Sequence, residues 1–161
     1  MKRGLLVAGI HLAIVLGIFG KYSWDRANLP RAWARTMNYD PNLPIRGRYV
    51  SLLVVVDIPD PAPQNPFDNT RVVLNKTGDR LTATIARTGG LRAFKRGPDG
   101  TRAMVLAEPV PFFIPEHAAD PTRLKPGEEL WVELSVPSRG EPRPVRLGVK
   151  RGGSIDPLPM Q

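Results

Sequence analysis

The side chains best suited to metal or acid–base chemistry lie in one short segment, at Glu116, His117 and Asp120. Positions four residues apart share one side of a helical turn, so Glu116 and Asp120 would meet there while His117 points elsewhere. A catalytic zinc usually has three protein ligands, and the only other histidine is His11. We therefore expect a surface turn here and predict no metal-binding residue.

Residues for nucleophilic catalysis are also scarce. The chain has no cysteine, which excludes thiolate catalysis, disulfides and cysteine-based metal sites. A Ser/Lys hydrolase of the signal-peptidase kind needs a serine shortly before its first long strand, and residues 40–46 contain none. Ser51 falls inside an apolar strand pattern, where we expect it to be buried. We predict no catalytic residue, no enzyme activity and no cofactor, with an envelope hydrolase of this type or a ligand-binding carrier domain as alternatives.

The element that must position the rest of the chain is an uncharged apolar stretch over residues 4–20. As a helix it extends about 25 Å, close to the thickness of a bilayer core. Tyr22 and Trp24 follow at the position of an interfacial aromatic belt. A cleavable signal peptide has a shorter apolar region that ends in a small-x-small site, whereas the exit here is mostly bulky. We predict an uncleaved transmembrane anchor over residues 1–24.

The charges beside this stretch set its expected orientation. The amino terminus, Lys2 and Arg3 outweigh Lys21 and Arg26, whose charge Asp25 partly offsets. The side with more positive charge stays in the cytoplasm. We therefore place the amino terminus in the cytoplasm and the remainder of the chain on the other side of the membrane.

Within the anchor, Gly9, Ala13 and Gly17 recur every fourth residue and share one stripe. Small residues at this spacing let transmembrane helices approach closely. The stripe predicts packing against a membrane-protein partner. His11 in the same helix reads as a neutral imidazole bonded to a neighbouring helix rather than as a functional ionisable group.

Two further regions follow the anchor. Residues 25–44 predict a juxtamembrane linker, with a short amphipathic helix up to Arg35 broken at Pro30 and then an extended proline-containing path. Residues 45–161 predict a β-rich domain, because short alternating patterns are separated by Gly and Pro turns. The expected strands cover residues 48–56, 71–74, 81–87, 91–95, 102–107, 130–136 and 145–150. The predicted fold class is mainly β, a small antiparallel barrel or sandwich preceded by a single N-terminal transmembrane helix.

The net charge of +8 bears on partners more than on fold. The basic residues are dispersed and no nucleic-acid-binding motif is present, so we predict no nucleic-acid partner. The lipid bilayer is the expected partner of the anchor. A basic exported surface suits anionic lipid headgroups or acidic envelope polymers. The alternative is that the excess of positive charge only keeps the domain soluble.

The segment Gly47-Arg48-Tyr49-Val50-Ser51-Leu52-Leu53-Val54 resembles the signature of the bacterial GDYXXLXY proteins, a family of membrane-anchored proteins. Gly47, Tyr49 and Leu52 match the signature, while Arg48 and Val54 stand in place of its Asp and last Tyr. A second block of the family, two aromatics and then a Glu, is similar to residues 112–118 and matches Phe113 and Glu116.

The resemblance implies a bacterial inner-membrane protein with a periplasmic domain and a membrane-protein partner, and it brings no catalytic residue. From the residues alone, the same positions have structural roles. Gly47 allows a tight entry into a strand, while Tyr49 and Leu52 fill the core on its two faces. The expected function is a non-catalytic interaction or assembly module in the cell envelope.

Overall fold

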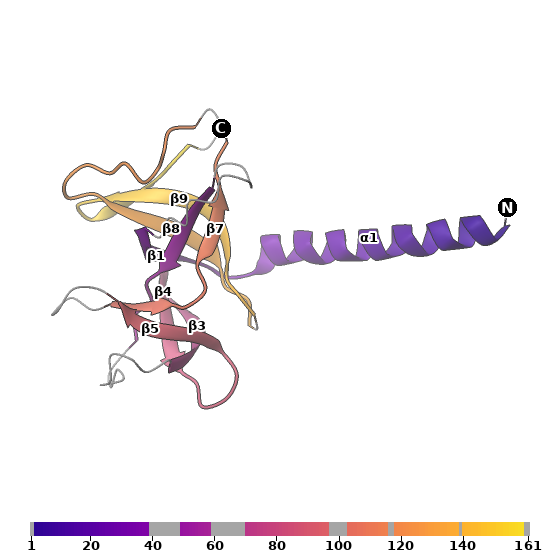
Figure 1. Cartoon of the computed structure of the whole chain (residues 1–161), viewed down its shortest axis with the longest axis horizontal. Helices are drawn as coiled ribbons and strands as arrows, with labels where there is room; N and C mark the ends of the chain where they lie inside the picture. The colour runs from indigo at the N-terminus through magenta and orange to yellow at the C-terminus, as the bar shows by residue number, and fades with distance from the viewer. Residues whose placement is uncertain are drawn as a thin grey trace.

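The computed structural model describes residues 2–38, 49–58, 70–96, 103–115, 118–138 and 140–159. One long helix, α1 (Lys2–Asn28), projects from a β-rich body, and the amino terminus lies at its far end (Figure 1). In the described residues the body contains the strands β1 (Arg31–Asn38), β2 (Tyr49–Val54), β3 (Thr70–Thr77), β4 (Arg80–Ile85), β5 (Leu91–Arg96), β6 (Ala103–Leu106), β7 (Val110–Phe113), β8 (Glu129–Ser135), β9 (Arg143–Arg151) and β10 (Ser154–Pro157).

The apolar part of α1 makes no buried contact with the body. Its segment Gly4–Asp25, 22 residues, is long and apolar enough to cross a membrane, and 0% of the apolar window is buried. At 1.5 Å per residue this segment extends about 33 Å, slightly more than a bilayer core. The predicted single N-terminal apolar helix is confirmed.

Strand β1 follows the helix almost immediately, through Leu29 and Pro30, and lies inside the sheet. Its first half pairs antiparallel with β8 and its last residues pair with β2. The expected amphipathic helix up to Arg35 is therefore wrong from Arg31 onward, and part of the stretch assigned to the linker over residues 25–44 belongs to the sheet. Pro30 cannot continue the helical hydrogen bonds, and the alternating Ala32 and Ala34 then bury on one face.

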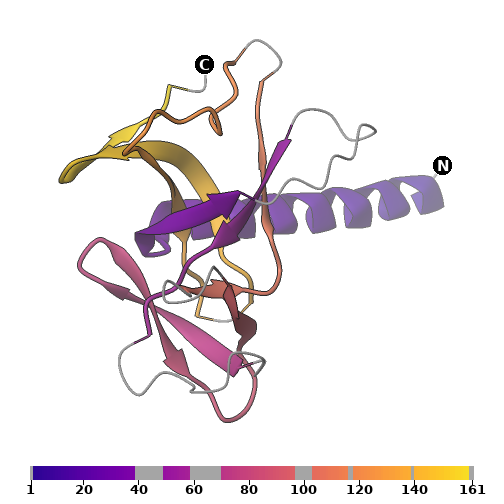
Figure 2. The same cartoon turned by 60° about the vertical axis from the view of Figure 1, so that its left-hand side comes forward.

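The strands form an open path in the order β10-β9-β8-β1-β4-β3-β5-β6, with β2 and β7 joined to it through β1. Among the described pairs of named strands, only the β1–β4 contact is parallel. Both views place β1 between the β8–β9 hairpin and the β3–β5 strands (Figures 1 and 2). Beyond β2, the N–H of Val56 donates to the carbonyl of Met104, which brings this segment to β6. The predicted mainly β fold with one N-terminal helix is confirmed.

One apolar core joins the strands. Strand β2 is covered on both sides, since Leu52 and Val54 are fully covered on one face and Leu53 is 2% exposed on the other. This confirms the prediction that the strand is buried on both sides. The core residues are Ala32, Ala34, Leu52, Val54, Val56, Val72, Leu81, Ala83, Ala93, Met104, Leu106, Val110, Leu130, Val132, Leu134, Val136 and Leu147.

Most expected strands are present with small changes at their ends. Two of the expected strands, at residues 91–95 and 102–107, pair with each other as β5 and β6. Strands β1, β7 and β10 were not predicted. The helical turn considered for Glu116 to Asp120 depends on Glu116 and His117, which lie outside the described residues.

Candidate functional site

The strands β1, β8 and β9 carry two different faces, because alternate side chains of a strand point to opposite sides of the sheet. On one side, Val132 of β8 pairs with Leu147 of β9 in the core. On the other side, Trp131 pairs with Gly148 of β9 and with Arg35 of β1. We call this second side the outer face, and it comprises Trp33, Arg35, Glu129, Trp131, Glu133, Arg146, Gly148 and Lys150.

Trp131 is at the centre of the outer face and is only 6% exposed. The guanidinium carbon of Arg80 lies 5.8 Å from the ring centroid, and the Lys150 ammonium lies 5.1 Å from it. The indole N–H donates to Glu129 Oε2 at 3.1 Å. Cations attracted to the face of an aromatic ring gain electrostatic stabilisation. The ring therefore holds two cations in place, and its own polar group is satisfied.

A second aromatic–cation unit lies beside it. Arg146 donates from Nε to Glu133 Oε2 at 2.7 Å and places its guanidinium carbon 5.4 Å from the Trp33 ring centroid. Glu133 is 7% exposed, so its carboxylate depends on this partner. Gly148 makes room for the ring, since a Cβ at that position would lie 3.0 Å from two Trp33 ring carbons and 2.8 Å from Ile155 Cγ2.

Between these units the surface is hollowed into a cavity of about 200 Å³, which we call the groove. Strands β1, β4, β8 and β9 and the segment after β2 all contribute to it. Its lining residues are Trp33, Ala34, Arg35, Val55, Asp57, Arg80, Leu81, Glu129, Trp131 and Lys150.

The charges of the groove are not balanced. Glu129 already accepts the Trp131 N–H and pairs with Arg35 at 3.5 Å. No carboxylate within the described ranges forms a salt bridge with Arg80 or Lys150. Asp57 is exposed at the edge. The groove thus presents two cations that are held by an indole rather than neutralised by an acid, which is an arrangement suited to binding an anion.

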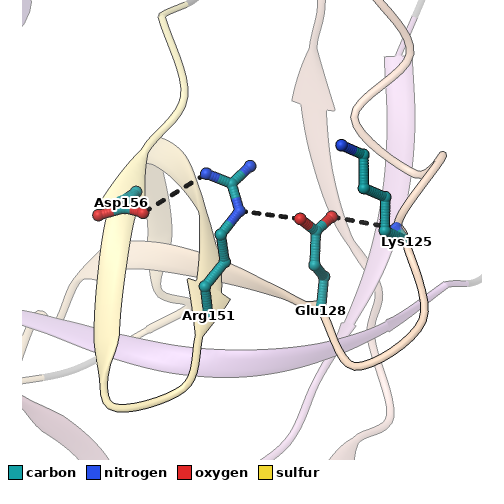
Figure 3. Close-up of polar contacts among 4 residues, drawn as sticks. All are labelled: Lys125, Glu128, Arg151 and Asp156. Carbon is teal, nitrogen blue, oxygen red and sulfur yellow. Dashed lines mark hydrogen bonds and ion pairs between the residues drawn. The ribbon is translucent and has the colours of Figure 1, made fainter.

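A polar cluster fastens the sheet next to the groove. Glu128 accepts the Lys125 N–H at 3.0 Å and Arg151 Nε at 2.8 Å, and Arg151 also reaches Asp156 at 3.6 Å (Figure 3). The Lys125 backbone hydrogen bond, followed by the Arg151 guanidinium, holds the pKa of the Glu128 carboxyl below its usual value. The Glu128 carboxylate raises the pKa of Arg151. The cluster links β8, β9 and β10 one residue away from Glu129 and Lys150, and so supports the groove.

The junction with the helix is at the opposite end of β9. Arg143 pairs with Asp25 at 3.6 Å, and its guanidinium carbon lies 4.6 Å from the Tyr22 ring centroid. At about 3.3 Å per residue, Lys150 is roughly 20 Å along β9 from Arg143. Figure 1 shows the turn between β9 and β10 on the side of the body away from α1. The Lys150 end of the groove is therefore remote from the helix, while Trp33 at its other end lies three residues after Pro30.

The residues singled out by the family signature fall in a different place. Tyr49 and Phe113 are paired across β2 and β7, with ring centroids 6.2 Å apart, and Leu52 is fully buried. Phe113 is 68% exposed. Gly47 and Glu116 lie outside the described residues. The structure thus brings together two of the five positions at a sheet edge, separate from the groove.

The anchor residues Gly9, Ala13 and Gly17 lie on the exposed helix. A Cβ added at Gly9 or Gly17 would meet nothing within 4 Å, and Ala13 is exposed. His11 Nδ1 is 2.8 Å from the carbonyl oxygen of Val7, four residues earlier in the same helix.

For the enzyme alternative, Ser51 is buried in β2 as expected. Asp120 accepts hydrogen bonds from the N–H and hydroxyl of Thr122, while Glu116 and His117 lie outside the described residues. In the part of the chain that the structure covers, no group of three or more His, Cys, Asp or Glu side chains is placed to hold a metal ion. For the carrier alternative, a wider hollow of about 540 Å³ opens near β5, β6 and β7.

Sequence reasoning missed the groove, although it assigned Trp131 and Lys150 to strands. The available signal was the i, i+2 spacing of Trp33 with Arg35 and of Glu129 with Trp131, and the i, i+4 spacing of Arg146 with Lys150 on either side of Gly148. That signal has meaning only after the three segments are paired. Comparison with protein-family models, curated proteins and solved structures finds no match to this chain.

Proposed function

We propose that this chain is a single-pass bacterial inner-membrane protein whose β domain is a non-catalytic binding module on the periplasmic side. The amino terminus is in the cytoplasm, and α1 remains attached as the anchor. The observation that carries the proposal is the helix itself. An apolar segment of 22 residues has no covering layer in the described structure and leads through Leu29 and Pro30 directly into a strand inside the sheet.

The short connection supports an anchor that also positions the domain. The N–H of Val136 donates to the Pro30 carbonyl, and Arg143 contacts both Tyr22 and Asp25 near the end of the helix. A domain held this closely presents a fixed side to the membrane and its groove to the aqueous compartment. Removal of the helix would also remove these contacts, which favours retention over cleavage.

The anchoring test uses the tagged full-length protein. After alkaline carbonate extraction, we expect the protein in the membrane pellet, with an intact mass that includes residues 1–24. Recovery of a soluble chain lacking these residues would overturn the anchor. Trp24→Ala, a change outside the apolar stretch of residues 4–20, serves as the matched control and should stay in the pellet.

The proposal includes a membrane-protein partner that packs on the small-residue stripe of the anchor. Replacing Gly9, Ala13 and Gly17 together by Leu keeps the helix apolar but fills the stripe. We expect weaker association with the partner in a membrane two-hybrid assay. Replacing Leu6, Ile10 and Ile14 by Val is the control. Equal association of both triple variants with the partner would contradict packing on the small-residue stripe.

A further inference from the structure

We propose that the groove binds a sugar bearing a carboxylate or phosphate group, with Arg80 and Lys150 holding the anion beside Trp131. This inference rests on the proposal that the domain is a binding module, and it names the ligand class. It does not depend on which side of the membrane the domain occupies.

The anion requirement comes from the two cations. Both lie near the same indole, at 5.8 and 5.1 Å from its centroid, and both line the groove, so a ligand in the groove meets both. The third groove cation, Arg35, is paired with Glu129, whose other oxygen accepts the Trp131 N–H. Hydrogen bonds in which the donor or the acceptor is charged are shorter and stronger than neutral ones. A carboxylate or phosphate satisfies Arg80 and Lys150 together, which a neutral ligand does not.

The sugar scaffold follows from the size and the remaining lining. The cavity of about 200 Å³ is below the roughly 300–1,000 Å³ of pockets that hold drug-sized ligands, which suits a ligand of one substituted six-membered ring. Asp57 is exposed at the edge, where its carboxylate can accept hydrogen bonds from ligand hydroxyl groups. Half-buried Trp33 adds an apolar wall. A small anion without a sugar ring would leave Asp57 and Trp33 without a contact to the ligand.

The Lys150 end of the groove lies away from the lipids of the anchoring membrane. Lys150 lies roughly 20 Å along β9 from Arg143, the residue that contacts the end of the anchor. At physiological salt, the attraction of a headgroup layer falls off within about 8 Å, so lipid headgroups do not supply the anion at Lys150. The ligand we propose is a soluble or polymeric acidic glycan in the aqueous compartment.

The test titrates full-length protein in uncharged detergent with glucuronic acid, glucose 6-phosphate, glucose and inorganic phosphate. Tryptophan fluorescence and calorimetry report binding. We expect glucuronic acid or glucose 6-phosphate to bind more tightly than both glucose and inorganic phosphate, and the tighter of the two identifies the anion. Their affinity should fall as salt is raised.

The decisive test compares two double variants that each remove one arginine charge and one lysine charge. Arg80→Gln with Lys150→Gln should weaken binding of the anionic sugar about tenfold or more, whereas Arg71→Gln with Lys76→Gln, two exposed cations of β3, should leave it within about twofold. Arg80→Lys with Lys150→Arg keeps both charges and should retain binding, which guards against a folding defect.

Three results would overturn the inference: no saturable binding of either acidic sugar, binding of glucose or inorganic phosphate as tight as that of the acidic sugars, or an equal loss in the β3 control. None of these results bears on the carbonate extraction, so failure of the ligand class and failure of the anchor are distinguishable.

Discussion

The two faces of strand β9 bury side chains by different means. Leu147 is fully covered because it points into the apolar core, opposite Val132. Its neighbours Arg146 and Gly148 point to the outer face, where coverage comes from tryptophans, ion pairs and long cationic side chains lying over one another. The inner face is part of the apolar core and stabilises the fold. The outer face keeps charge close to aromatic rings at the surface, where each exposed ion pair adds little to stability.

The largest expected effect is on the inner face. Leu147→Ala removes a fully buried side chain from the core, and we expect a loss of about 3 kcal/mol in the free energy of unfolding. Denaturant unfolding of full-length protein in detergent, followed by tryptophan fluorescence, measures it. A loss below about 1 kcal/mol would remove the distinction between the two faces.

The next effect is at Arg146. Arg146→Ala leaves the Glu133 carboxylate, 7% exposed, without the guanidinium that lies 2.7 Å from it. We expect a loss of about 1.5 kcal/mol, reduced from the buried-pair value because the arginine is half exposed. Adding Glu133→Gln should recover part of this loss. If the double variant is less stable by the sum of the single changes, the two residues do not interact.

A smaller change is expected at Gly148. In Gly148→Ala, the new methyl group would lie 2.8 Å from Ile155 and 3.0 Å from Trp33, so one of these side chains must move. We expect about 1 kcal/mol of destabilisation with a shifted tryptophan emission maximum. Gly153→Ala, where a Cβ meets nothing within 4 Å, is the control. Unchanged stability together with unchanged emission in Gly148→Ala would mean that neither Ile155 nor Trp33 lies against this position.

The smallest effect concerns acid stability at the end of the sheet. The pKa of Glu128 is lowered in the folded protein by Lys125 N–H and Arg151, so its contribution is present above the unfolded value of 4.5 and is lost as the pH falls through the folded pKa. Glu128→Gln should therefore lose less stability than the natural chain between about pH 6 and pH 3. Identical pH profiles of the unfolding midpoint would show that the carboxylate is not held in this way.

The sequence was informative where the signal is local. The charge-free stretch after Arg3 predicted the apolar helix, the double apolar pattern around Leu52 predicted a strand covered on both sides, and regular alternation predicted most of the remaining strands. Strand β1 was missed because Ala32, Ala34 and Arg35 are good helix formers, and only pairing with β8 and β2 overrides that preference.

The groove could not be predicted from the sequence, for a related reason. Trp33, Arg80, Trp131 and Lys150 come from four strands far apart in the sequence, and their approach depends on the register of β1, β4, β8 and β9. A one-residue shift of any of these strands would send its groove residue into the core. Local patterns do not contain that register, so the charges appeared dispersed.

The central claim is that an uncleaved helix holds the groove-bearing end of the domain on the far side of the membrane. Since the chain has no cysteine, Gly153→Cys in the open turn between β9 and β10 introduces a single thiol there. A membrane-impermeant maleimide should label this thiol in spheroplasts, and should label a cysteine placed in a tag ahead of Met1 only after lysis. The reverse labelling pattern, or labelling of a soluble chain that lacks residues 1–24, would contradict the account.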